Sequence, residues 1–208
     1  PQAAPALLHI WEFEEDEGTA AVDQVSGAVI TVDPSHWSSR RHGNYAIKTS
    51  PDIPIIGQAN VPLGSRDLSL AFWWRNSSYP EDGEAKIIFK ESAGSDKNLF
   101  GLETSYYRLG YHFNGAYDIF AQGFGAGLPQ DDKWHHIALV YDSYRYRLNL
   151  YVDGEERFSR PHIWMLESGS LGYFDIRTGV PPSIVDDLRL YRGALQAEEI
   201  GEIYANTK

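Results

Sequence analysis

The sequence predicts an all-β fold of two packed antiparallel sheets, with one short helix near its C-terminal end. Short runs of alternating apolar and polar residues, separated by turn residues, recur along nearly the whole chain. The Asp153-Gly154 pair that ends one of these runs is a strong hairpin signal. Helical spacing of apolar residues occurs only near the end, at Leu195, Ile200, Ile203 and Tyr204.

The expected strands follow one another without an internal linker or repeat, which indicates one domain over residues 7–208 after a linker remnant at residues 1–6. From Leu68 to Trp74 every second residue is large and apolar, so this set is expected to face the core and Trp73 the other side. The helix is expected over residues 197–205, where Glu198 and Glu199 favour its N-terminus. The other expected strands lie at 7–13, 86–90, 99–104, 107–113, 117–124, 134–141, 148–152, 171–176 and 184–191.

Composition excludes several classes of function. The 18 basic and 29 acidic residues give a net charge of −11, which repels phosphate backbones and anionic lipids, so we expect neither nucleic acid nor a membrane surface as partner. The chain has no cysteine, which excludes disulfides, cysteine nucleophiles and thiolate metal sites. No apolar stretch approaches the length of a membrane span, and no membrane insertion is expected.

Five segments carry a resemblance to a known family: WEFEEDEGTAAVDQVSG, DLSLAFWWR, WHHIALVYD, LNLYVDGEE and VDDLRLYRGALQAEEIGEIY. Their order along residues 8–204 is similar to that of laminin-G-like domains, which belong to the concanavalin A-like lectin/glucanase superfamily. The resemblance implies a two-sheet jelly-roll sandwich. It implies no single function, because this fold hosts lectins, adhesion modules, glycosidases and lyases. One departure is Gln196, where the family usually has a helix-capping serine.

The resemblance also implies a structural calcium ion. Asp23 in DQVSG and Asp186 in VDDLRLY match positions that commonly hold Ca²⁺ in laminin-G-like domains, and backbone carbonyls near Gly43 and Asn44 complete the expected shell. Carboxylate and carbonyl oxygens are the ligands that this hard cation prefers. The alternative is that Asp23 caps a turn and Asp186 pairs with a neighbouring arginine.

Aromatic residues are unusually dense, with eight between positions 100 and 124. The C–H faces of sugars pack on aromatic rings, and tyrosine and tryptophan add a polar group. Sandwich cores use the same residues, so each ring has a core alternative. The candidate ligand contacts are Trp73 with its neighbour Arg75, then Tyr111, His112 and Tyr117, and finally Trp164 in the segment RPHIWML.

The expected function is a non-catalytic carbohydrate-binding or adhesion module, secreted or at the cell surface, within a larger multidomain chain. Its expected partner is a polysaccharide or another glycan, or a protein. One alternative is a glycoside hydrolase or polysaccharide lyase of the same fold, although the dense acidic run at 12–17 lies outside a central strand and the lyase motifs are missing. A further alternative is a structural or protein-binding spacer domain of a surface protein.

Overall fold

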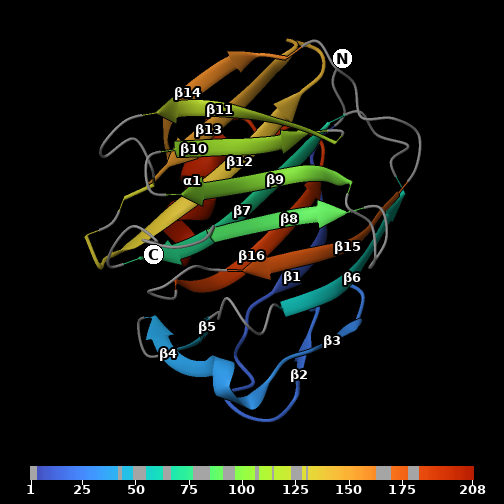
Figure 1. The fold of residues 1–208 in the computed structure, drawn as a ribbon, viewed down its shortest axis with the longest axis vertical. Helices are drawn as coiled ribbons and strands as arrows, with labels where there is room; N and C mark the ends of the chain where they lie inside the picture. Colours follow the sequence, from blue (N-terminus) through green and yellow to red (C-terminus); the bar gives the residue numbers. More distant parts are fainter. Residues whose placement is uncertain are drawn as a thin grey trace.

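The computed structural model describes residues 4–41, 44–48, 55–62, 67–76, 85–90, 97–105, 108–113, 115–122, 128–129, 131–162, 170–177 and 183–208. The strands form two large antiparallel sheets packed face to face, and a helix near the C-terminus covers the outer face of one sheet (Figure 1). The predicted all-β sandwich with its C-terminal helix is confirmed. No helix in the described ranges combines the length and the apolar character needed to cross a membrane.

The sheet under the helix, called the large sheet, has eight strands in the order β14-β13-β12-β7-β16-β5-β4, with β1 paired to β16 beside this path. β1 begins at Ala6, inside the segment expected to be linker. The strands of the large sheet are β1 (Ala6–Trp11), β4 (Trp37–Arg41), β5 (Asn44–Lys48), β7 (Leu68–Arg75), β12 (Trp134–Asp142), β13 (Arg147–Val152), β14 (Glu155–Pro161) and β16 (Ile184–Arg192).

The second sheet, called the small sheet, has six strands in the order β11-β10-β9-β8-β15-β6. They are β6 (Ile55–Pro62), β8 (Ala85–Lys90), β9 (Asn98–Ser105), β10 (Arg108–Phe113), β11 (Ala116–Gln122) and β15 (Ser170–Arg177). A separate pair, β2 (Ala20–Val22) and β3 (Val29–Thr31), precedes the short 3-10 turn η1 (Pro34–His36).

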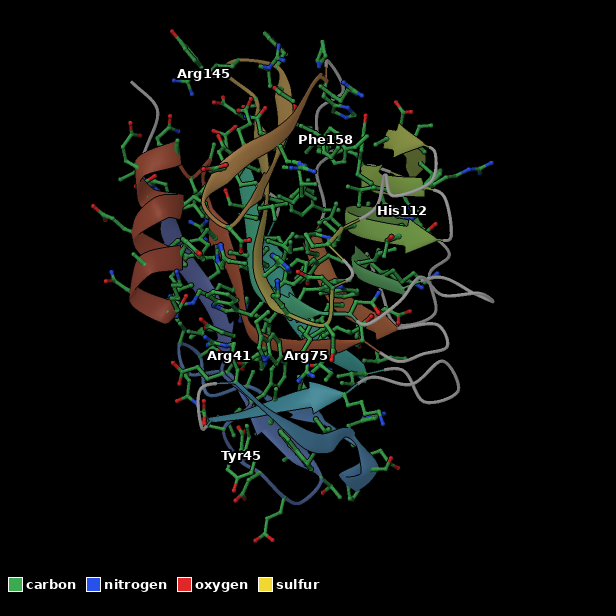
Figure 2. All side chains as sticks on the ribbon, turned by 90° about the vertical axis from the view of Figure 1, so that its left-hand side faces the viewer. Arg41, Tyr45, Arg75, His112, Arg145 and Phe158 are labelled. Carbon is green, nitrogen blue, oxygen red and sulfur yellow. The ribbon has the colours of Figure 1, made fainter. Side chains whose placement is uncertain are left out.

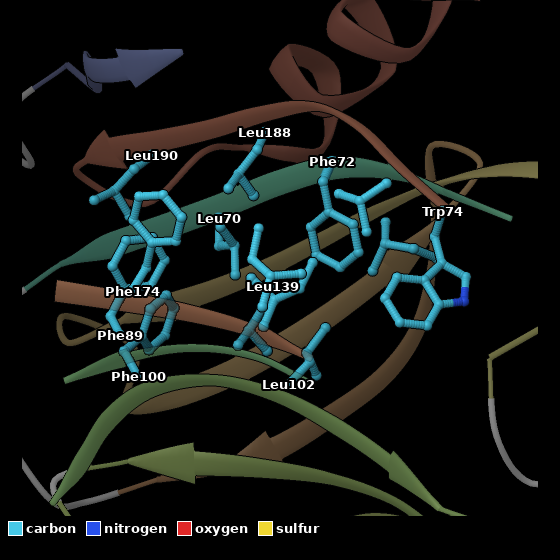
Figure 3. Packing of buried hydrophobic residues seen from close by; sticks show 14 of the residues in the cluster. Leu70, Phe72, Trp74, Phe89, Phe100, Leu102, Leu139, Phe174, Leu188 and Leu190 are labelled. Atoms are coloured by element: carbon cyan, nitrogen blue, oxygen red, sulfur yellow. The ribbon is translucent and has the colours of Figure 1, made fainter. Parts of the chain in front are cut away.

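The core lies between the two sheets and is built from the inward halves of their strands (Figure 3). In β7 the expected alternation is confirmed, since Leu68, Leu70, Phe72 and Trp74 all belong to this core. All six strands of the small sheet contribute rings or aliphatic chains, among them Phe89, Phe100, Leu102, Phe113 and Phe174. Burial of this apolar set is the main driving force for the fold.

Helix α1 (Ala197–Thr207) seals the outer face of the large sheet. The N-terminus of the helix is capped without the family's serine. The Glu199 carboxylate accepts a hydrogen bond from the Gln196 backbone N–H at 2.7 Å. Ile200 is fully buried in a second apolar cluster that joins the helix to the sheet. The sheet side of that cluster comprises Ala71, Ala138, Val140, Tyr151, Tyr191, Ala194 and Leu195. The central strands of the large sheet are therefore buried on both faces.

Candidate functional site

The outer face of the small sheet lies on the side of the molecule opposite α1, and no helix or strand of the described ranges covers it in Figure 2. Strand alternation brings His112 of β10 to this face, because its neighbours Tyr111 and Phe113 point into the core. Tyr117 of β11 stands directly across from His112 in the sheet register. We call this surface the small-sheet face.

Four side chains on this face, Asn98, Glu103, His112 and Tyr117, form the His112 cluster. His112 Nε2 lies 2.8 Å from Glu103 Oε2, and its Nδ1 lies 3.1 Å from Asn98 Nδ2. An amide nitrogen only donates, so His112 Nδ1 accepts and Nε2 carries the proton that it donates to Glu103. The imidazole therefore links the Asn98 amide to the Glu103 carboxylate.

Two glycines permit close approaches around this cluster, one to a neighbouring backbone and one to a ring. Gly101 lies opposite His112 in β9, where an added Cβ would meet the Ile87 carbonyl oxygen at 2.2 Å. Gly110 lies under the Tyr117 ring, where an added Cβ would come within 2.4 Å of the phenol. The Tyr117 and His112 ring centroids are 5.0 Å apart. Gly110 therefore lets the Tyr117 ring pack against β10, and Gly101 lets the β8 backbone approach β9 closely.

Exposure divides the cluster into a fixed base and an accessible ring. Glu103 and His112 are each 8% exposed, whereas Tyr117 is 40% exposed. Further across the same face, Lys90 Nζ of β8 pairs with Asp175 Oδ2 of β15 at 3.4 Å. This arrangement offers an aromatic face, a carboxylate and an amide to a polar ligand with flat C–H faces.

Trp73, expected to contact ligand, is buried at 2% exposure under α1. Its Nε1 donates to Thr207 Oγ1 at 2.9 Å, and the Tyr204 ring of the helix lies 5.7 Å away between centroids. The His136 ring packs against its edge at 5.4 Å. Trp73 points away from the core, as predicted. Helix α1 covers that outer face of the large sheet, so the ring has no face open to a sugar.

Two more of the expected ligand residues lie elsewhere. Tyr111 is a core residue whose hydroxyl reaches Asp118 Oδ2 at 3.2 Å, and burial raises the pKa of its phenol to about 12. Arg75 ends β7 in the large sheet, where its guanidinium forms a fork with Asp132 through bonds of 2.9 and 3.1 Å. Trp164 lies outside the described residues. Of the six candidates, the structure brings together His112 and Tyr117.

The carboxylates expected to share calcium have different partners. Asp23 is fully buried and accepts hydrogen bonds from the ring of His9, the N–H groups of Ile10 and Val25, and Ser26. Burial by itself would raise the pKa of Asp23, but these hydrogen bonds, led by Ser26 and Ile10, hold it below its usual value. Asp23 thus fixes the turn after β2, as the alternative interpretation expects.

Asp186 meets a cation of the protein itself. Its Oδ2 accepts from Arg41 Nε at 2.6 Å, and its Oδ1 accepts from the Asp187 N–H at 2.8 Å. The donors around Asp23 and Asp186 do not fit one shared metal ion, and the described residues hold no group of three metal-ligating side chains. Gly43 lies outside these residues, and Asn44 begins β5. Calcium binding stays a prediction.

Sequence reasoning missed Glu103 and Asn98. Glu103 stands out of phase with the core residues Phe100 and Leu102 of its own strand, and this phase was available from the sequence. The position of Asn98 could not be predicted from strand alternation. A bulge shifts the register, so that Lys90 pairs with Asn98 while Phe89 pairs with Phe100.

Comparison with known proteins gives a family match and a set of similar structures. A family model described as the concanavalin A-like lectin/glucanases superfamily matches residues 55–201. No curated protein matches the sequence. The binding domain of botulinum neurotoxin serotype G superposes with a TM-score of 0.75 at 16% identity, covering 97% of this chain and 51% of that one. This chain therefore spans about half the length of that domain.

Two further structures are similar at low identity. Domain 4 of AbnA, a GH43 extracellular arabinanase from Geobacillus stearothermophilus solved with arabinotriose, has a TM-score of 0.68 and 14% identity, covering 97% of this chain and all 100% of that one. The binding domain of botulinum neurotoxin DC, solved with rat synaptotagmin II, has a TM-score of 0.70 and 10% identity, covering 97% and 52%. At these identities the likeness shows the fold.

Proposed function

The chain belongs to the concanavalin A-like lectin/glucanases superfamily, and we propose that it is a non-catalytic module that binds a glycan on the small-sheet face. The observation that carries the proposal is the His112 cluster, in which a partly exposed tyrosine ring stands beside a fixed carboxylate, imidazole and amide. A sugar would stack on Tyr117 and direct its hydroxyls to Glu103 and Asn98.

The fixed base of the cluster favours binding because little order is lost when a ligand arrives. Glu103 and His112 hold each other, and Gly110 seats the Tyr117 ring against the strand. Groups positioned before binding cost less conformational entropy on association. A single stacked ring contributes about 1 kcal/mol beyond area burial, which suits weak attachment strengthened by repetition along a polysaccharide.

The extracellular location is part of the same proposal. Its support is the similar domain of an extracellular arabinanase, which holds arabinotriose. A protein partner is the competing interpretation, supported by the similar neurotoxin domain that was solved with synaptotagmin. A glycan-binding domain is retained on immobilised glycans and a protein-binding domain is not, so binding measurements on glycans separate the two interpretations.

A glycan array probed with the intact chain, together with a reducing-sugar assay on the retained polysaccharides, tests the proposal. We expect retention on at least one glycan class without release of reducing ends. Release of reducing ends would make the domain a hydrolase. Absence of retention on every glycan would overturn glycan binding and favour a protein-binding or spacer domain.

A further inference from the structure

A recess lies on the helix side of the molecule, away from the small-sheet face. It is a polar pocket of about 310 Å³ between the segment after β1, the end of β4, the middle of β16 and the last turn of α1. We call it the Arg41 pocket. Its size is at the lower end of the range of small-molecule sites, about 300–1,000 Å³. Figure 2 labels Arg41 of this pocket and His112 of the small-sheet face, which lie on different sides of the sandwich.

Two backbone bends direct acidic side chains into the Arg41 pocket. Phe13 has a φ of 54° and buries its ring in the core, so Glu12 and Glu14 on either side of it line the pocket. Asp187 has a φ of 49°, at the irregularity where β16 changes its partner from β5 to β1. Residues other than glycine rarely adopt this left-handed backbone conformation.

Guanidinium groups hold the floor of the pocket in place. Arg41 is 7% exposed, and its Cζ lies 4.6 Å from the centroid of the Trp73 ring. Its Nε donates to Asp186, and its Nη1 donates to the Thr207 carbonyl oxygen. Arg189 donates to both oxygens of Asp187, at 2.8 and 3.0 Å. Arg41 therefore ties β4, β16 and α1 together at this point.

Glu14 also lines the pocket, and its carboxyl lies within the electrostatic influence of Glu12 and Arg41. Burial raises the pKa of Glu14, and the nearby charges of Glu12 and Arg41 act on the same carboxyl in opposite directions. Glu14 Oε2 also accepts a hydrogen bond from the Tyr45 N–H at 3.5 Å, and Glu14 and Arg41 both line the pocket. The pocket presents carboxylate acceptors and guanidinium donors within one small volume.

This lining limits the chemistry of a ligand. A metal ion would have to displace the arginines that already neutralise Asp186 and Asp187. An anion would meet four carboxylates against three cationic side chains, those of Arg41, Arg189 and Lys208, so the lining carries a net negative charge. A flat apolar group would find no apolar side chain among the described residues that line the pocket. Neighbouring hydroxyl groups fit best, because each one donates to a carboxylate while accepting from a guanidinium N–H.

We propose that the Arg41 pocket binds two neighbouring hydroxyls of a neutral sugar unit, as a hydrogen-bonding site separate from the His112 cluster. This proposal rests on the proposed glycan-binding function. The Arg41 pocket itself is formed by different residues, on the opposite side of the sandwich from the His112 cluster. Binding there would depend on hydrogen bonds without a stacking ring, so single sugar units are sufficient as probes.

Nuclear magnetic resonance of the intact chain, titrated with glucose, galactose, mannose and arabinose, tests this site. The reporters are the Trp73 Nε1–H, which lies beside Arg41 and Thr207, and the Arg41 Nε–H. We expect saturable shifts of both signals with at least one neutral sugar. Glu14→Gln should weaken that binding about tenfold, because the sugar hydroxyl then donates to a neutral amide oxygen and no longer to a charged carboxylate. The control is Glu17→Gln, an exposed change on the same segment outside the pocket.

The outcomes separate this site from the small-sheet face. Tyr117→Ala should leave the shifts of Trp73 and Arg41 unchanged even if it abolishes retention on the array. The proposal is overturned if no neutral sugar shifts these signals, if Glu14→Gln and the parent chain bind equally, or if only an amino sugar such as glucosamine produces the shifts. Failure on the glycan array with intact pocket shifts would overturn the small-sheet site alone.

Discussion

The outer faces of the two sheets are built by the same alternation of strand residues, but they differ in burial. Helix α1 covers the outer face of the large sheet, whereas the outer face of the small sheet carries a partly exposed ring. On the large sheet, Trp73 and His136 stand out of phase with the core and are buried under α1 at 2% and 1% exposure. On the small sheet, Tyr117 occupies the equivalent phase and is 40% exposed. An aromatic residue that points away from the core is available to a ligand only where no further layer covers it.

Truncation of Trp73 should show this contrast most strongly. Trp73→Ala removes a buried ring that packs on Tyr204 and supports Arg41, so we expect a loss of about 3–5 kcal/mol in the free energy of unfolding. Tyr117→Ala should cost less than about 1 kcal/mol, as for an exposed substitution. Urea unfolding followed by circular dichroism measures both, and equal losses would contradict the distinction between the two faces.

The buried charges beneath α1 make stability depend on pH. Burial raises the pKa of Asp186 to about 6 from a model-peptide value of 3.8, against the opposing effect of Arg41. Between these values the folded chain holds a proton that the unfolded chain has released, so the contribution of Asp186 to stability falls as pH rises. Asparagine resembles the protonated form. Relative to the parent, Asp186→Asn should therefore gain up to roughly 3 kcal/mol between pH 4 and pH 6.

His136 gives the opposite sign on the same side of the sheet. Burial lowers the pKa of its imidazole to about 4 from 6.5, so the parent gains stability as pH rises through this interval. The stability of His136→Gln relative to the parent should accordingly fall over the same range. Urea titrations at several pH values check both signs, and a flat difference for both variants would show that α1 does not bury these groups.

Glu103 tests the base of the small-sheet face. Glu103→Leu leaves the His112 Nε2–H without its acceptor, which should cost about 1–3 kcal/mol of stability. Glu103→Gln retains an acceptor oxygen and should cost less. The same denaturant experiment measures this order, and a Glu103→Leu variant as stable as the parent would show that the pair does not hold the cluster.

Calcium gives the smallest expected effect. A shared ion at Asp23 and Asp186 would raise stability by about 2.7 kcal/mol at a hundredfold excess over its Kd. Because Asp186 pairs with Arg41 and Asp23 accepts its hydrogen bonds from the protein, an ion would have to displace these donors, so we expect the rise in Tm from EDTA to calcium to be small. A rise in Tm that disappears in Asp186→Asn would establish the ion expected from the family resemblance.

Local patterns predicted the fold because they act over a few residues. The alternation from Leu68 to Trp74, the Asp153-Gly154 turn and the helical spacing near Ile200 each specify their element without distant partners. The family resemblance, confirmed by the match over residues 55–201, supplied the arrangement of the sheets.

The candidate sites depend on distant pairings that these patterns do not contain. Arg41 and Asp186 are 145 positions apart, and no local signal selects Arg41 among the basic residues. Trp73 lies beside Thr207, which is 134 positions away, so its burial follows from where α1 docks and not from the strand pattern. His112 and Tyr117, by contrast, belong to neighbouring strands of one hairpin and could be predicted from their own segment.

Binding of the chain and of Tyr117→Ala to the glycan retained on the array tests the central claim most directly. The matched control is Tyr144→Ala, which removes a ring that is 77% exposed on the turn between β12 and β13. We expect Tyr117→Ala to weaken binding about fivefold or more, from the loss of about 1 kcal/mol of stacking, with a Tm lowered by no more than about 4 °C. Unchanged affinity in Tyr117→Ala, or an equal loss in Tyr144→Ala, would contradict glycan binding on the small-sheet face.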